Sequence, residues 1–277
     1  MKKTLIVLAT LALSAALVSA QDLKSVSEVF NSGAAALNEG NKTEALAAFQ
    51  QALTEATALG EEGNEVAGNC RNVIPNLMVS ISKDMFKGGD MDGAIDKAKE
   101  AVALATEYGD AEQAGSAQKT LGQFLVQKGS LALKAKDYDK AVESFKTVLE
   151  ADPVNGVAAL RLGMALAGKG DNDGALEAYN TAAANGQEAA AKKQIGKLYL
   201  IKASNAYKAK DFKTAVDNAL ESIKYDPSAN AYKIAGNASA QLKDNKSAVE
   251  YLSKYVEINP SASDAAQVKS TIEVLKK

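Results

Sequence analysis

Six short segments of this 277-residue chain share one pattern, a polar turn followed by an alanine and then an aliphatic residue. The shared alanines are Ala45, Ala94, Ala141, Ala175, Ala215 and Ala248. A small residue stands twelve positions before each of them, at Gly33, Ser82, Gly129, Gly163, Ala203 and Gly236. Two antiparallel helices approach to about 8–10 Å only where the residues between them are small. The repeated spacing therefore predicts six helical hairpins.

The apolar residues between these markers recur with helical spacing. The predicted second helix of the third hairpin carries such a stripe at Tyr138, Ala141, Val142, Phe145, Val148 and Leu149. Proline follows twelve residues after three of the alanines, at Pro153, Pro227 and Pro260, where it ends one helix and can open the next. No alternating stretch indicates a strand, so an all-α fold is expected.

The spacing of small residue, turn, alanine, aromatic residue and proline resembles the tetratricopeptide repeat (TPR), a helix-turn-helix unit of 34 residues. The resemblance covers about residues 26 to 260. It implies a right-handed α-solenoid of about six TPR-like helical hairpins plus a C-terminal capping helix. The first two spacings exceed 34 residues, so long first helices are expected at about Glu65–Lys87 and Asp110–Lys136, with Pro75 starting or kinking the former.

The expected organisation has eight segments. They are a signal peptide at 1–20, repeats at 21–60, 61–109, 110–153, 154–186, 187–227 and 228–260, and a capping helix at 261–277. Ser261 or Ser263 is expected to cap the last helix, whose apolar stripe of Val268, Ile272 and Leu275 would cover the end of the stack. A disordered tail is the alternative.

The N-terminus has the features of an export signal. Lys2 and Lys3 precede an apolar stretch from Leu5 to Val18, and Val18-Ser19-Ala20 forms a small-residue cleavage site. Cleavage after Ala20 would give a periplasmic or secreted protein without stable membrane insertion. A retained single-span anchor is the alternative.

Several residue types are too rare to support common chemistry. The chain has no histidine, one cysteine (Cys70) and two arginines (Arg71 and Arg161) among 32 basic residues, with a formal net charge of −2. Histidine-based catalysis, metal sites that need histidine or several cysteines, and an intramolecular disulfide are thereby excluded. Nucleic acid is disfavoured as a partner, and no metal site or cofactor is predicted. For Cys70 we expect burial, the alternative being pairing with a partner's thiol.

By resemblance to the family, the first helices of the hairpins line a concave groove. The candidate partner-binding residues at the lining positions are Phe86, Val126, Leu133, Leu160, Met164, Lys197, Leu200, Tyr207, Lys233 and Asn237. The middle of this set is apolar and its C-terminal end is polar and basic, which favours an extended or helical peptide as ligand. The alternative is that Val126, Leu133, Leu160 and Met164 pack inside the stack. Lys233 and Asn237 match the family's clamp for C-terminal carboxylates, but the repeats that would complete the clamp do not follow.

The sequence thus predicts a noncatalytic scaffold or adaptor for protein–protein interaction in the bacterial cell envelope. One alternative is a self-associating structural component of an envelope assembly, and a less favoured one is a glycan-active enzyme that uses carboxylates alone. Six of the nine tyrosines lie in the last 80 residues, which favours a contact region there. The alternative, preferred for Tyr251 and Tyr255, is that these rings fill packing positions.

Overall fold

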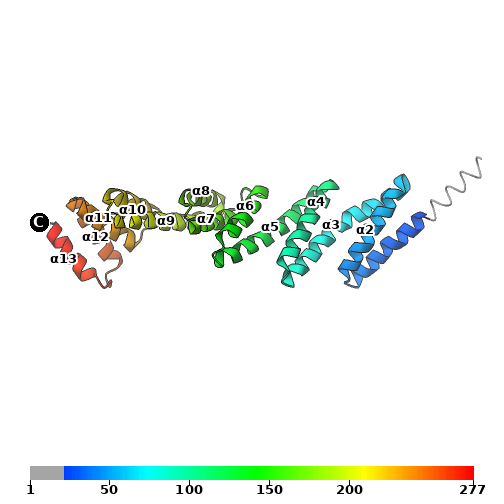
Figure 1. Cartoon of the computed structure of the whole chain (residues 1–277), viewed down its shortest axis with the longest axis horizontal. Coiled ribbons are helices and arrows are strands. Elements are labelled where there is room, and N and C mark those ends of the chain that lie inside the picture. Colours follow the sequence, from blue (N-terminus) through cyan, green and yellow to red (C-terminus); the bar gives the residue numbers. More distant parts are fainter. Residues whose placement is uncertain (1–21) are drawn as a thin grey trace, which may run out of the picture. The chain divides into compact units, whose positions relative to one another are not determined.

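The computed structural model describes residues 22–277, and this part of the chain is helical with short turns and no strand (Figure 1). It divides into two compact halves at Gln127 and Lys128. We call residues 22–127 the N-terminal half and residues 128–277 the C-terminal half. The prediction of an all-α stack of helical hairpins is confirmed. The predicted signal peptide lies outside the described residues.

The N-terminal half consists of hairpins that pack in chain order. Its elements are a helix at residues 22–38, α2 (Lys42–Ala58), the 3₁₀ helix η1 (Gly60–Gly63), α3 (Asn64–Lys87), α4 (Met91–Glu107) and the start of α5 (Ala111–Lys134). The helix α2 packs on α3, and α3 packs on α4. Pro75 lies buried inside α3 and does not start that helix.

The C-terminal half continues the same arrangement and ends on a single helix. After the end of α5 come α6 (Tyr138–Ala151), α7 (Gly156–Lys169), α8 (Asn172–Ala182), the kinked turn η2 (Ala183–Gln187), α9 (Glu188–Lys208), α10 (Phe212–Tyr225), α11 (Ala229–Gln241), α12 (Asn245–Ile258) and α13 (Ala265–Leu275). Each helix from α6 to α13 contacts the next one along the chain.

The small residues permit the close approach that the sequence predicted. A Cβ added at Gly129, Gly163 or Gly236 would lie 2.9, 2.5 or 2.7 Å from the side chains of Phe145, Tyr179 and Leu252, respectively. Gly33 faces Phe49 in the same way at 3.1 Å. Each of these large side chains stands four residues after a shared alanine. Every hairpin of this kind is therefore held by a large side chain seated on the backbone of the partner helix.

Aspartates in the polar turns hold the starts of the second helices. Asp90, Asp137, Asp171, Asp211 and Asp244 each precede such a helix, and each side chain accepts a hydrogen bond from the backbone N–H three residues later. A cap of this kind stabilises a helix by about 0.5–2 kcal/mol. This explains why the polar turn recurs with the alanine.

Three of the same turns contain lysine in a left-handed backbone conformation. Lys136, Lys210 and Lys243 have φ values of 60°, 63° and 62°, whereas Gly170 occupies the corresponding turn position with φ 89°. A side chain in this conformation costs about 1 kcal/mol that glycine does not. We expect Lys210→Gly to raise the free energy of unfolding by roughly that amount and Gly170→Ala to lower it similarly, as measured by hydrogen exchange of the two helices that each turn joins. If both substitutions changed the free energy of unfolding in the same direction, the left-handed lysines would not be strained.

The last helix covers the end of the stack, but it begins later than predicted. Val268 and Ile272 are buried against Leu252 and Tyr255 of α12, so the C-terminal residues form an ordered cap. The residue at the N-cap position is Asp264, and the expectation that Ser261 or Ser263 caps the helix was wrong. Successive turns, in which Ala262 N–H donates to Asn259 and Ala265 N–H donates to Ala262, delay the start of the helix.

Candidate protein-binding face

The first helices of successive hairpins in the C-terminal half are neighbours. The helix α7 contacts α9, and α9 contacts α11. The packing residues Gly163, Ala203 and Gly236 set a common register, so Leu160, Leu200 and Lys233 occupy equivalent positions three residues before them. These helices therefore present matching rows of side chains.

An open hollow of about 330 Å³ lies between α9 and α11. It is lined by Leu200, Ile201 and Ser204 of α9 and by Asn230, Lys233 and Ile234 of α11. Ile201 is 56% exposed beside this hollow. Leu200 and Lys233 belong to the residues predicted from sequence, and the hollow brings them together.

The helix α7 extends this surface with apolar side chains. Val157 is 39% exposed and Met164 is 37% exposed, while Leu160 between them is half-buried against the cluster that contains Tyr179. We define the first-helix face as the rows of exposed and half-buried side chains on one side of α7, α9 and α11. Its members are Val157, Leu160, Met164, Lys197, Leu200, Ile201, Ser204, Asn230, Lys233, Ile234 and Asn237.

Lys233 is already paired within the chain. Its ammonium lies 2.5 Å from a carboxylate oxygen of Asp264, at the start of α13, and the hydroxyl of Tyr255 donates a hydrogen bond to the same carboxylate. The Lys233 ammonium also lies 5.4 Å from the centre of the Tyr255 ring. These contacts lower the pKa of Asp264, chiefly through the Lys233 hydrogen bond, and raise the pKa of Lys233. The match to a carboxylate clamp is therefore not supported, because the lysine has an internal carboxylate.

Some predicted residues take part in packing instead. Phe86 stacks on Phe124 with ring centres 4.4 Å apart, within the N-terminal half. Leu133 packs against the buried cluster around Phe145, and Val126 is half-buried. For Phe86 and Leu133 the packing interpretation is thus the better one. Met164 and Lys197 remain exposed, as a binding role requires.

The C-terminal tyrosines also have structural partners. Tyr199 stacks on Tyr225 with ring centres 6.0 Å apart, and Tyr207 meets the edge of Phe212 at 5.5 Å. Tyr251 packs on the alanine cluster of α9, α10 and α11, and Tyr255 is buried. The concentration of tyrosine is therefore explained by packing and gives no separate evidence for a contact region.

Sequence reasoning missed three residues of this region. Ile201 and Ile234 stand two residues before Ala203 and Gly236, so an alignment of all positions in the repeats could have identified them. Asp264 could not be found in this way, because its pairing with Lys233 depends on how α13 turns back onto the stack.

Few other features of the described residues could support binding or catalysis. Cys70 is a free, buried thiol whose pKa is raised to about 11 by burial, so the prediction of burial is confirmed. Among residues 22–277, no group of three acidic or cysteine side chains is placed to hold a metal ion. No helix in that range has the length and apolar character needed to cross a bilayer.

The family follows from a comparison with known repeats. Residues 126–190 and 202–263 match the family model of the tetratricopeptide repeat. The chain contains tetratricopeptide repeats. The matched segments end before α13, as expected for a cap that follows the last repeat. No curated protein matches the chain in sequence.

Several solved structures are similar in fold. A MamA protein is 22% identical, with 56% of this chain and 82% of that chain covered and a TM-score of 0.40. YrrB, described as a TPR protein with an unusual peptide-binding site, is 20% identical over 70% of this chain and 91% of its own, with a TM-score of 0.40. PilW, described as a widely conserved type IV pilus biogenesis factor, is 14% identical over 70% and 98%, with a TM-score of 0.38. The tetratricopeptide repeats at residues 126–190 and 202–263 support a role as a scaffold for protein–protein interaction.

Proposed function

We propose that this TPR protein is a noncatalytic adaptor of the bacterial cell envelope that holds a peptide or helical segment of a partner protein on its first-helix face. One observation carries the proposal. The hollow between α9 and α11 is open and combines apolar side chains (Leu200, Ile201 and Ile234) with polar ones, although the hairpins that form it already bury their packing residues.

The stack uses Leu160 and Ile234 of this face in part, since each packs against a buried cluster, but it leaves Ile201 exposed. Leu252 sits on Gly236, and Ala203 is fully buried, so the contacts that join α9 and α11 to their second helices are complete. Ile201 nevertheless exposes more than half of its surface beside Ile234. Adjacent exposed apolar side chains in a concave site are typical of a surface that receives an apolar anchor.

The envelope location rests on the N-terminal sequence. The lysine pair, the apolar stretch and the Val18-Ser19-Ala20 site together favour export and cleavage. We therefore place the adaptor in the periplasm or outside the cell.

Site-specific photo-crosslinking tests this function in intact cells. A photoreactive residue at Ile201 should yield a covalent adduct with a partner, whereas the same residue at Leu220, an apolar side chain on α10 that is 37% exposed, should not. Mass spectrometry of the adduct identifies the partner and should show Gln21 as the N-terminus of the chain. A product with twice the mass of the chain would favour the self-associating alternative instead.

Substitution of both hollow-lining isoleucines supplies the complementary prediction. Ile201→Ser with Ile234→Ser should reduce partner capture at least tenfold, because about 1.4 kcal/mol of apolar contact would be lost. Leu220→Ser is the control and should leave capture unchanged, with the helical circular dichroism of both variants equal to that of the parent. Undiminished capture by the double variant would contradict the proposed site.

A further inference from the structure

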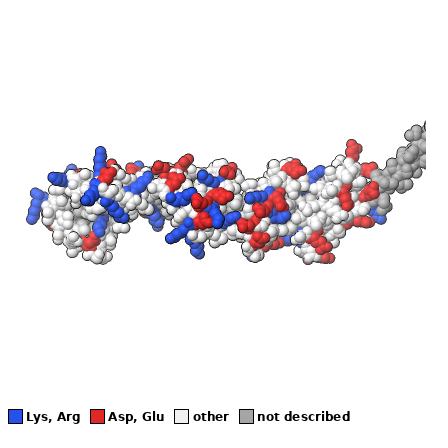
Figure 2. Space-filling view, in the orientation of Figure 1, with Lys and Arg blue, Asp and Glu red and all other residues white. Residues whose placement is uncertain are grey.

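Charge is segregated between the two helix layers of the C-terminal half. The first helices α7, α9 and α11 carry eight lysine and arginine residues and one acidic residue, Glu188. The second helices α6, α8, α10 and α12 carry six basic and nine acidic residues. In the N-terminal half, the first helices up to residue 127 carry five of each. The basic first-helix layer is therefore a property of the C-terminal half, over which lysine side chains gather in Figure 2.

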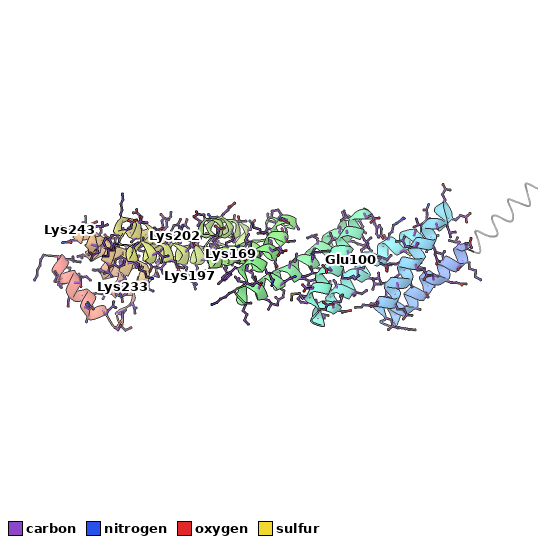
Figure 3. The ribbon with its side chains drawn as sticks, viewed as in Figure 1. Glu100, Lys169, Lys197, Lys202, Lys233 and Lys243 are labelled. Carbon is purple, nitrogen blue, oxygen red and sulfur yellow. The ribbon has the colours of Figure 1, made fainter. Side chains whose placement is uncertain are left out.

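The lysines of α9 differ in their partners according to the side of the helix on which they lie. Lys192 pairs with Glu188 at 2.6 Å, and Lys202 pairs with Asp173 at 3.5 Å. Lys193, Lys197 and Lys208 are exposed and have no ion pair within the described residues. At 100° per residue these three fall within about 60° of the helix circumference, on the same side as Leu200 and Ser204. The unneutralised charge thus lies on the same side of α9 as the first-helix face, of which Lys197 is a member (labelled in Figure 3).

An apolar row runs beside this basic row. Val157, Leu160 and Met164 follow one side of α7, and α7 itself has no acidic residue. Ile201 and Ile234 continue the apolar surface into the hollow. Arg161 donates a hydrogen bond to Ser130, so its guanidinium is held against α5. A ligand lying between α7 and α9 would therefore meet apolar side chains on one flank and free ammonium groups on the other.

The basic row and the apolar row together indicate the chemical character of the bound segment. This inference rests on the proposed function. We infer that the first-helix face receives an acidic amphipathic segment of another protein, with apolar side chains against α7 and the hollow and glutamates or aspartates along Lys193, Lys197 and Lys208. Charge complementarity of this kind raises the association rate and rejects partners of the wrong sign. The interleaved aliphatic side chains favour a polypeptide over a nucleic acid, whose bases need aromatic stacking surfaces.

Fluorescence anisotropy with three labelled model helices tests the assignment on the full chain. All three peptides carry the same length and label. The first has a leucine stripe with glutamates elsewhere, the second has the same leucines with lysines, and the third keeps the glutamates but has serine at the leucine positions. The glutamate–leucine peptide should bind about tenfold more tightly than either of the others, with the preference over the lysine peptide falling as salt rises. A single-stranded oligonucleotide serves as the fourth probe and should bind more weakly than the first peptide.

Charge reversal on the two layers provides the matched comparison. Lys193→Glu with Lys197→Glu should weaken binding of the glutamate–leucine peptide about tenfold. Lys213→Glu with Lys246→Glu makes the same change in charge at exposed, unpaired lysines of α10 and α12, and should alter the affinity less than about twofold.

The outcomes separate this inference from the proposed function. Equal binding of the glutamate and lysine peptides, or equal effects of the two charge reversals, would overturn the acidic partner while leaving an apolar peptide site in place. Tighter binding of the oligonucleotide would overturn it in favour of a polyanion site. Absence of binding by all three peptides, together with no crosslink at Ile201, would overturn both proposals.

Discussion

Gly63→Ala should lower the free energy of unfolding of the N-terminal half by about 3 kcal/mol, the upper range for overpacking. Gly63 ends η1, and a Cβ built on it would lie 1.9 Å from the backbone carbonyl oxygen of Ala56. Its φ of −86° suits any residue, so space alone requires glycine here. Because the obstacle is backbone in the middle of a buried contact, α2 and α3 would have to separate to admit a methyl group.

Gly68→Ala makes the same chemical change five residues later and should have the opposite sign. Nothing lies within 4 Å of a Cβ at Gly68, which is in the interior of α3. Alanine in place of glycine inside a helix stabilises it by up to about 1 kcal/mol. The two variants thus have the same composition and differ only in what surrounds the new methyl group.

Hydrogen exchange read by mass spectrometry is the appropriate measurement, because repeat arrays need not unfold as one cooperative unit. Peptides from residues 22–127 should lose protection in Gly63→Ala and gain it in Gly68→Ala. Similar protection in both variants would show that the turn between α2 and α3 can yield, which would contradict the close packing described here.

The features predicted correctly from sequence were those that each repeat encodes locally. Gly129 and Phe145 belong to one hairpin, in which the sequence predicted a small residue at Gly129 and an apolar stripe that includes Phe145, and the structure brings these two residues into contact. The polar turns were predicted in the same way, whereas the helix caps that their aspartates form were found only in the structure. The small residues and the polar turns recur in every hairpin, and recurrence makes them visible in a single sequence.

The features that sequence could not supply depend on how one hairpin meets the next. Leu133 and Met164 each belong to an apolar stripe with helical spacing on a first helix. Leu133 nevertheless packs against the Phe145 cluster, whereas Met164 is exposed. A single stripe does not separate a groove from a core. The pairing of Lys233 with Asp264 requires the path of the chain between α12 and α13, which no local pattern specifies. Binding residues are therefore harder to predict than packing residues in this fold.

Phe145→Ala should produce the largest loss in the C-terminal half, about 3–5 kcal/mol. The ring of Phe145 is fully buried among Ala141, Leu162, Ala165 and Ala178. Three of these buried neighbours are alanines, which cannot extend into the space that the ring leaves, so much of the cavity stays open. Phe212→Ala removes the same ring from a half-buried position beside Tyr207 and should cost less than half as much, as measured by hydrogen exchange in residues 128–277.

A double-mutant cycle shows whether the ring acts through its seat on the partner helix. A methyl group at Gly129 would lie 2.9 Å from the Phe145 ring, so Gly129→Ala alone should destabilise the hairpin. When Phe145 is also alanine, that obstacle is gone and part of the cavity is filled. The double variant should therefore be at least about 1 kcal/mol more stable than the sum of the single effects predicts. Simple additivity would mean that glycine is kept at this position for some reason other than contact with the ring, and the physical basis of the repeated spacing would have to be sought elsewhere.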